Sequence, residues 1–139
     1  MQLQIGEALP ALIPLIKDFH ERSKIPYSFA QTLKQLYAVP LNPTHEFVVA
    51  VHEDGSYQGY LWAEVLENRD FWLHQVYAPK DDLSSVFLEY SDREARRLGC
   101  ARLAGFFYRT REEAEAYCRK FQLKVSAIMV ERNLNGGQP

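Results

Sequence analysis

Hydrophobic residues in the first forty positions recur at the spacing of helices. The apolar residues of 12–19 fall at i, i+4 and i+7, which places them on one helix face. A second helix is predicted to begin after Ser28, whose hydroxyl makes a good N-cap, and to end before Pro40. A short alternating strand is expected at 3–5, ahead of the turn at Gly6. The chain is therefore predicted to start with a strand and two helices.

The next forty positions change to the period of strands. The runs FVVAVHE and QGYLWAEVLE flank Asp54 and Gly55, a dipeptide typical of hairpin turns. A second turn at 68–70 leads to a third run, FWLHQVY, at 71–77. We therefore predict a three-stranded antiparallel meander.

A long helix over 82–98 is predicted to follow. Asp81 or Asp82 is expected to cap it, and Val86 belongs to its predicted buried stripe. Gly99 stands where a helix C-terminus commonly places a glycine.

The remaining pattern continues this alternation of strands and helices. ARLAGFF predicts a buried strand at 101–107, and Thr110 with Glu113 predicts a capping box for a last helix. Apolar residues 125–130 predict a final strand.

The element order defines an α/β class with a mixed sheet. An antiparallel meander is followed by β-α-β-α-β, and a right-handed crossover makes the strands at 71–77 and 101–107 a parallel pair. We expect 1–134 to form a single domain and 135–139 to be a flexible tail.

Composition narrows the function classes. The net charge is −2, which argues against a protein that mainly neutralises phosphate backbones. The charge is uneven, because residues 93–120 hold 8 basic and 4 acidic side chains. This segment is either a solvated helix face or a patch that binds an anion or a partner. Nucleic acid is not the expected ligand.

The sequence shows no pattern typical of a signal peptide, a membrane span or a disulfide framework. No basic residue precedes the first apolar stretch, which Pro10 and Pro14 interrupt, and no run has the length of a membrane span. Cys100 and Cys118 lack the spacing of a disulfide framework. We expect a cytoplasmic protein without a membrane segment.

Several motifs together resemble the GNAT acyltransferase family over nearly the whole chain. They are the hairpin DGSYQGYLWAEV with Gly59, the strand end HQVYAP and the segment AYCRKFQLKVSAIMVERNL, which is similar to the family's F-Y-x-K-x-G-F ending. The resemblance implies that the strands at 71–77 and 101–107 splay apart and that acyl-CoA lies between them. It also implies that a loop R-x-x-G-x-G/A holds the pyrophosphate on amides at a helix N-terminus.

The corresponding segment here, APKDDLSSVFLEY, departs from that loop. It has no glycine and no arginine, and Asp81 and Asp82 place carboxylates where the phosphates would bind. Lys80, Ser84 and Ser85 are the side chains that could partly substitute. The resemblance further implies that the backbone amides of Val76 and Tyr77 would hold the pantetheine and the thioester carbonyl. We therefore expect no cofactor, or acetyl-CoA if the protein is active.

Catalytic residues are also altered. In the family, a tyrosine acts as the general acid that protonates the departing CoA thiolate, and Cys118 aligns with this tyrosine. Cys118 could donate that proton, or it could be a small core residue. His74 is the titratable side chain of the strand at 71–77 and the candidate base, or it could be a packed residue, and Glu64 and Glu67 are expected on the neighbouring strand. The histidines show no metal-ligand spacing, so no metal is expected, and P-loop, serine-hydrolase and dinucleotide motifs are missing.

Three hypotheses follow. The favoured one is a GNAT-fold pseudoenzyme that serves as an interaction or structural module, through a protein partner or self-association. Short GNAT-like proteins with altered motifs occur in phages, so a virion location is a further possibility. The alternatives are an active N-acetyltransferase with an atypical phosphate site and a nucleic-acid or anion binder that uses residues 93–120.

Overall fold

The computed structural model describes residues 5–125, with the backbone alone at residues 5–8 and 81. The chain divides into two compact units, Met1–Tyr108 and Arg109–Pro139, and each is described by itself. The predicted last strand at 125–130 falls almost entirely outside the described residues, and so does the predicted tail.

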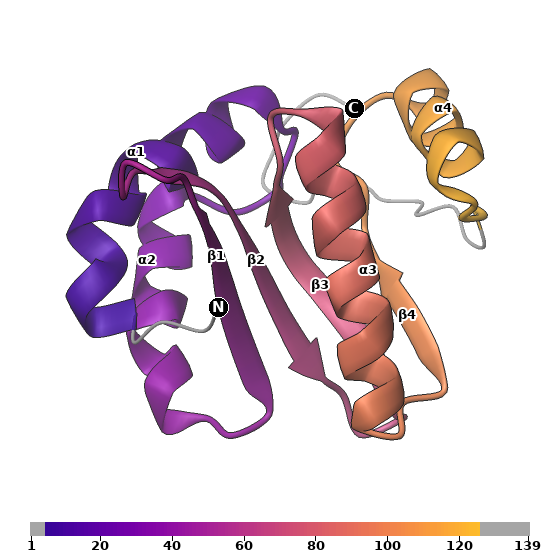
Figure 1. Cartoon of the computed structure of the whole chain (residues 1–139), viewed down its shortest axis with the longest axis horizontal. Helices are drawn as coiled ribbons and strands as arrows, with labels where there is room; N and C mark the ends of the chain where they lie inside the picture. The colour runs from indigo at the N-terminus through magenta and orange to yellow at the C-terminus, as the bar shows by residue number, and fades with distance from the viewer. Residues whose placement is uncertain (1–4, 126–139) are drawn as a thin grey trace, which may run out of the picture. The chain divides into compact units, whose positions relative to one another are not determined.

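The described part of the first unit, residues 5–108, contains three helices, a short 3-10 turn and four strands (Figure 1). In chain order they are α1 (Ile5–Arg22), α2 (Phe29–Ala38), η1 (Val39–Leu41), β1 (His45–Val51), β2 (Tyr57–Val65), β3 (Asp70–Tyr77), α3 (Asp81–Arg97) and β4 (Arg102–Gly105). The second unit contains α4 (Arg111–Phe121). None of the helices in the described part has the length and apolar character needed to cross a bilayer.

The strands form one mixed sheet in the order β1-β2-β3-β4. β1, β2 and β3 make the predicted antiparallel meander, and β4 pairs with β3 in parallel. This confirms the fold class expected from the sequence. The parallel pairing joins Asp70–Leu73 to Arg102–Gly105 and goes no further, so the last four residues of β3 have no pairing with β4. The two strands therefore part where the family resemblance places its notch.

Two hydrophobic cores cover the two faces of the sheet. One joins α1 and α2 to the face that carries Phe47, Tyr60 and Trp62. The other joins α3 to the face that carries Leu61 and Phe71. The sheet therefore lies between an α1–α2 layer and α3.

Local chemistry explains two of the boundaries. The Ser28 hydroxyl accepts from the Gln31 amide at 3.2 Å, and the Gln31 side chain accepts from the Ser28 amide at 2.7 Å, which is a complete capping box. The hairpin between β1 and β2 turns at Gly55, whose φ of 87° favours glycine. The Ser28 N-cap and the hairpin turn were predicted, whereas the reciprocal bond from Gln31 was not.

Gly59 has a different role, because it lets α3 approach the sheet. A Cβ at this position would lie 2.4 Å from the Tyr77 carbonyl oxygen and 2.7 Å from Cδ2 of Leu83. The first turn of α3 therefore packs directly on the backbone of β2.

Four sequence expectations differ from the structure. Residue 5 is helical, so the strand expected at 3–5 does not include it. The N-cap of α3 is Lys80, not Asp81 or Asp82, because the helix begins directly after the short connection from β3. Val86 is 56% exposed, since α3 turns other residues toward the sheet. β4 covers 102–105 and contains no buried residue, whereas a buried strand over 101–107 was expected.

Candidate functional site

The N-terminus of α3 is where the family resemblance would place the pyrophosphate of acyl-CoA. Residues 78–80 connect β3 to the helix, and Lys80 caps it in an extended conformation without a side-chain hydrogen bond. The Leu83 amide donates to Oδ1 of Asp82 at 3.0 Å. A helix N-terminus attracts anions through such amides. Here the Leu83 amide is already shared between the Asp82 carboxylate and the Lys80 carbonyl, which lies 3.1 Å away.

The predicted substitutes for the missing glycines differ in accessibility. Ser84 is 5% exposed, so its hydroxyl is buried against the rest of the fold. Lys80 and Ser85 are exposed at the start of α3. Of these three side chains, Ser84 is therefore the least suited to contact a phosphate from solvent.

On the α1–α2 side of the sheet, side chains occupy the space next to the open end of β3. The Tyr77 hydroxyl donates to Oδ2 of Asp18 on α1 at 2.6 Å. Burial, followed by the hydrogen bond and the charge of Asp18, raises the pKa of Tyr77 to about 12. The side chain is therefore held neutral and tied to α1. Val76 is half-buried and packs in the core on the α3 side.

Gln75 connects this region to both N-terminal helices. Its Oε1 accepts from the Tyr60 hydroxyl at 2.7 Å, and its Nε2 donates to Thr32 at 3.2 Å and to Tyr27 at 3.3 Å. Nε2 of His20 lies 2.7 Å from the same Thr32 hydroxyl. A hydrogen-bonded network therefore fills the space between the end of β3 and the α1–α2 layer.

A cavity of about 450 Å³ lies at the other end of α3. It is lined by the buried Glu46, by Tyr90 and by the ion pair of Glu94 and Arg97, among others. The Tyr90 hydroxyl donates to Glu46, and burial raises the pKa of that carboxyl. A second cavity of about 240 Å³ is lined by residues of α2, η1 and β1 and by Asn42. Neither cavity is lined by a residue of 74–86.

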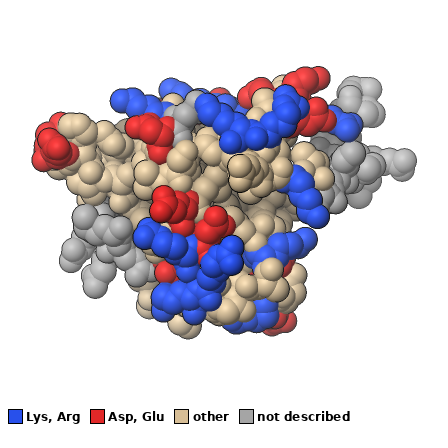
Figure 2. Space-filling model, turned by 45° about the vertical axis from the view of Figure 1, so that its right-hand side comes forward, with Lys and Arg blue, Asp and Glu red and all other residues tan. Residues whose placement is uncertain are grey.

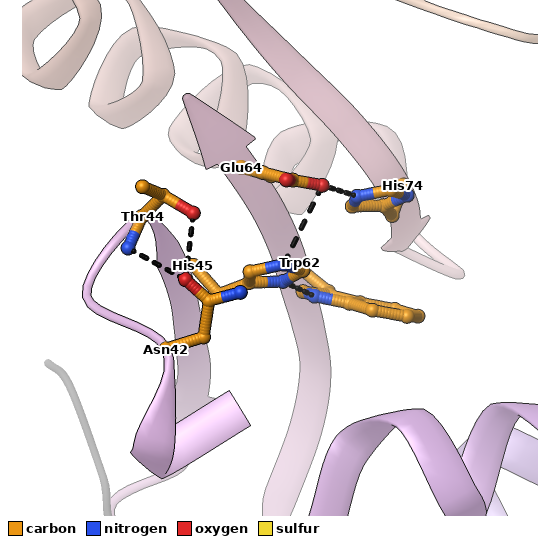
Figure 3. Close-up of polar contacts among 6 residues, drawn as sticks. All are labelled: Asn42, Thr44, His45, Trp62, Glu64 and His74. Atoms are coloured by element: carbon orange, nitrogen blue, oxygen red, sulfur yellow. Dashed lines mark hydrogen bonds and ion pairs between the residues drawn. The ribbon is translucent and has the colours of Figure 1, made fainter. Parts of the chain in front are cut away.

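A cluster of polar side chains crosses three neighbouring strands (Figure 3). Glu64 on β2 stands opposite His45 on β1, and His74 lies at the irregularity in the β2–β3 pairing. Nε2 of His74 is 2.7 Å from Oε1 of Glu64, and Nε2 of His45 is 3.4 Å from the same oxygen. The two imidazole rings are parallel, with centroids 5.6 Å apart. We call these three residues the His–Glu cluster.

Trp62 sets the protonation of one imidazole in the cluster. Its indole N–H donates to Nδ1 of His45 at 3.0 Å, so that nitrogen must be unprotonated. Burial lowers the pKa of His45, which also favours the neutral ring. Nε2 of His45 therefore carries the ring proton and faces Glu64. Trp62 also stacks on His74, with centroids 4.5 Å apart.

The predicted site residues are only partly brought together. His74, Val76 and Tyr77 lie on one strand that ends next to Lys80 and the first turn of α3. Cys118 is half-buried on α4, in the second unit, and its predicted role beside a departing thiolate stays a prediction. Glu64 was expected on the strand next to His74, and it does contact His74. His45 was not expected there, because spacing along the chain does not show pairing across strands.

Four of the eight basic side chains of segment 93–120 form ion pairs with acids in the described residues. Arg97 pairs with Glu94, and Arg102 with Asp70. In the second unit Arg109 pairs with Glu113, and Arg111 with Glu115. On the face of the molecule drawn in Figure 2, acidic side chains lie among the basic ones. This pairing offers little support for a nucleic-acid surface.

Comparison with solved structures identifies the fold. The chain is similar to aminoglycoside 6'-N-acetyltransferase AAC(6')-Ih from Acinetobacter baumannii, with a TM-score of 0.74, 11% identity and coverage of 99% of this chain and 97% of that one. It is also similar to AAC(6')-IG from Acinetobacter haemolyticus, with a TM-score of 0.69, 12% identity and coverage of 91% and 92%. A third, AAC(6')-Iy, was solved in complex with CoA and gives a TM-score of 0.75, 10% identity and coverage of 96% and 92%.

These likenesses show that the chain has the GNAT fold of acetyltransferases. No model of a protein family matches the sequence, and no curated protein matches it. At these identities the comparison establishes the fold and leaves the chemistry to the residues of the site.

Proposed function

We propose that this chain is a GNAT-fold protein that has lost acyl-CoA binding and works as a non-catalytic module that contacts another protein. The observation that carries the proposal is the hydrogen bond from the Leu83 amide to the Asp82 carboxylate at the start of α3. An incoming pyrophosphate would have to displace a carboxylate and then remain beside its negative charge. Two like charges about 4 Å apart repel by about 1 kcal/mol in water and by more in a partly buried site.

The path of the chain around α3 supports the same conclusion. Residues 78–86 contain no glycine. Each residue there therefore carries a side chain next to its backbone, which obstructs the approach of a phosphate. Leu83 also packs over Gly59, which fixes the first turn against β2. The helix start therefore has little freedom to open around a diphosphate.

Exposed apolar side chains support a partner-binding role. Leu41 in η1 is 86% exposed and Tyr37 on α2 is 64% exposed. They are the two most exposed large apolar side chains of the described residues, and contiguous apolar surface marks protein contacts. The end of α2 with η1 is therefore the surface that we propose for a protein partner.

Calorimetric titration with acetyl-CoA tests the proposal. We expect no saturable heat, with a dissociation constant above about 1 mM, which corresponds to less than about 4 kcal/mol of binding free energy. Micromolar binding that excess CoA abolishes would contradict the proposal.

One observation favours the alternative of an active acyltransferase. The pairing between β3 and β4 stops at Leu73, so the end of β3 is open as the resemblance requires for a pantetheine. In that case the amides of Val76 and Tyr77 would hold the thioester, His74 would assist deprotonation and Cys118 would protonate the thiolate. Acetyl-CoA would then be the cofactor, and the same titration separates the two functions.

A further inference from the structure

The His–Glu cluster brings together three good metal ligands from three strands. One ring nitrogen of His45, one ring nitrogen of His74 and a carboxylate oxygen of Glu64 all lie within 4.8 Å of one another. Their side chains are 14%, 24% and 24% exposed, so the cluster is partly shielded but open to solvent. The cluster shares only His74 with the open end of β3, and it uses residues that the proposed function does not need.

The distances are close to those of a shared coordination sphere. Ligand atoms bound to one Zn²⁺ at 2.0–2.2 Å lie about 3.3 Å apart in a tetrahedron. The two distances to Glu64 are 2.7 and 3.4 Å. Small rotations of the three side chains would therefore place all of the donors around one ion, with solvent at the remaining position.

We propose that His45, Glu64 and His74 form a binding site for a divalent first-row transition-metal ion such as Zn²⁺. Two imidazoles and one carboxylate suit Zn²⁺, Co²⁺, Ni²⁺ or Fe²⁺, whereas Mg²⁺ and Ca²⁺ prefer sites made of oxygen alone. With an ionised carboxylate and neutral imidazoles, the site carries one negative charge before the ion binds.

The backbone positions the ligands in advance. Asn42 accepts at its Oδ1 from the amide and from the hydroxyl of Thr44, at 3.1 and 2.8 Å, which fixes the turn before β1 (Figure 3). The His45 amide donates to the Asn42 carbonyl at 3.2 Å. Register then places Glu64 opposite His45. Three strands of one sheet therefore hold the donors.

The hydrogen bond from Trp62 to His45 competes with metal binding, and this competition can be measured. In the metal-free protein, Nδ1 of His45 accepts from the indole and Nε2 carries the proton. When Nε2 binds a metal, the ring proton must be on Nδ1, where it faces the indole N–H. Metal binding therefore breaks the bond between Trp62 and His45. Removing the indole donor should consequently tighten binding instead of weakening it.

Co²⁺ and Zn²⁺ titrations test the site. Wild-type protein is expected to bind Co²⁺ with visible d–d absorption and to exchange it for Zn²⁺ in calorimetry. Glu64→Gln and His74→Ala should each weaken Zn²⁺ binding by about a hundredfold or more. His52→Gln is the matched control, because His52 is an exposed hairpin histidine beside Asp54, and it should bind Zn²⁺ like the wild type. Circular dichroism without metal establishes that each variant is folded.

Trp62→Phe is expected to bind Zn²⁺ about tenfold more tightly, which corresponds to about 1.4 kcal/mol. An imidazole ¹⁵N spectrum of the wild type gives the same information without substitution, since Zn²⁺ should shift Nε2 of His45 and move its proton to Nδ1. The proposal is overturned if wild-type protein binds neither ion at about 100 μM, or if binding survives His74→Ala. It is also overturned if Zn²⁺ leaves the His45 nitrogens unchanged, or if folded Trp62→Phe binds no more tightly than the wild type.

Discussion

The contact at Gly59 gives a sharp prediction for stability, because this residue sets how closely α3 packs on the sheet. In Gly59→Ala the new Cβ would lie 2.4 Å from the Tyr77 carbonyl oxygen and 2.7 Å from Cδ2 of Leu83. Real Cβ atoms do not approach closer than 3.0 Å, so the backbone of β3 and β2 must separate by about 0.6 Å. Overpacking of this kind costs about 1–3 kcal/mol, and we expect the upper end because a backbone atom has to move.

Gly55→Ala is the matched comparison. Position 55 has nothing within 4 Å of the added Cβ, but its φ is 87°. A left-handed conformation costs an alanine about 1–2 kcal/mol. Urea unfolding followed by tryptophan fluorescence measures both variants, and the m-value should stay unchanged. The reasoning is refuted if Gly59→Ala loses no more free energy of unfolding than Gly55→Ala.

Three further predictions follow from the site and the caps. Replacing Asp81→Gly and Asp82→Arg together should raise CoA affinity measurably in calorimetry, whereas Asp92→Arg, further along the same helix, should not. Burial raises the pKa of Glu46, so the folded state binds its proton more tightly than the unfolded state. Wild-type stability should therefore gain from this group as the pH falls from the folded pKa toward the usual 4.5, and urea titrations at several pH values should show that gain missing in Glu46→Gln. Ser28→Ala should lower the free energy of unfolding by about 1 kcal/mol, because it removes the hydroxyl of the capping box.

Local patterns carried the fold predictions that the structure confirms. The Ser28 cap, the turn at Gly55 and the meander depend on residues close together in the chain, so their chemistry is visible in the sequence. The parallel pairing of β3 with β4 was also predictable, because a single helix of this length crosses over the sheet with fixed handedness.

The residue at which α3 begins, and the side of α3 that packs on the sheet, depend on tertiary contacts that are not visible in the sequence. Leu83 and Phe87 pack where Gly59 leaves room, and this contact sets which side of the helix meets the sheet. Val86 is consequently exposed although it is apolar. The capping preference of Asp81 and Asp82 is weaker than this packing, so the helix begins after Lys80.

The His–Glu cluster could have been found from hairpin register. His45 lies nine positions before Asp54, and Glu64 lies nine positions after Gly55, so a two-residue turn at 54–55 predicts this pair. The pair is observed, although the register shifts by one residue between Ala50 and Val51. His74 could not be placed this way, since the pairing of β2 with β3 shifts between Trp62 and Ala63. The pair of His45 and Glu64 was therefore predictable from the sequence, whereas the position of His74 depends on the irregularity between β2 and β3.

An amide ¹H–¹⁵N spectrum recorded while CoA is added tests the central claim most directly, because it observes the helix start itself. If the Asp82 carboxylate occupies the Leu83 amide at the start of α3, the signals of residues 80–86 should show no saturable shift at micromolar CoA. Saturable shifts of those signals and of residues 74–77 at micromolar CoA would contradict the account.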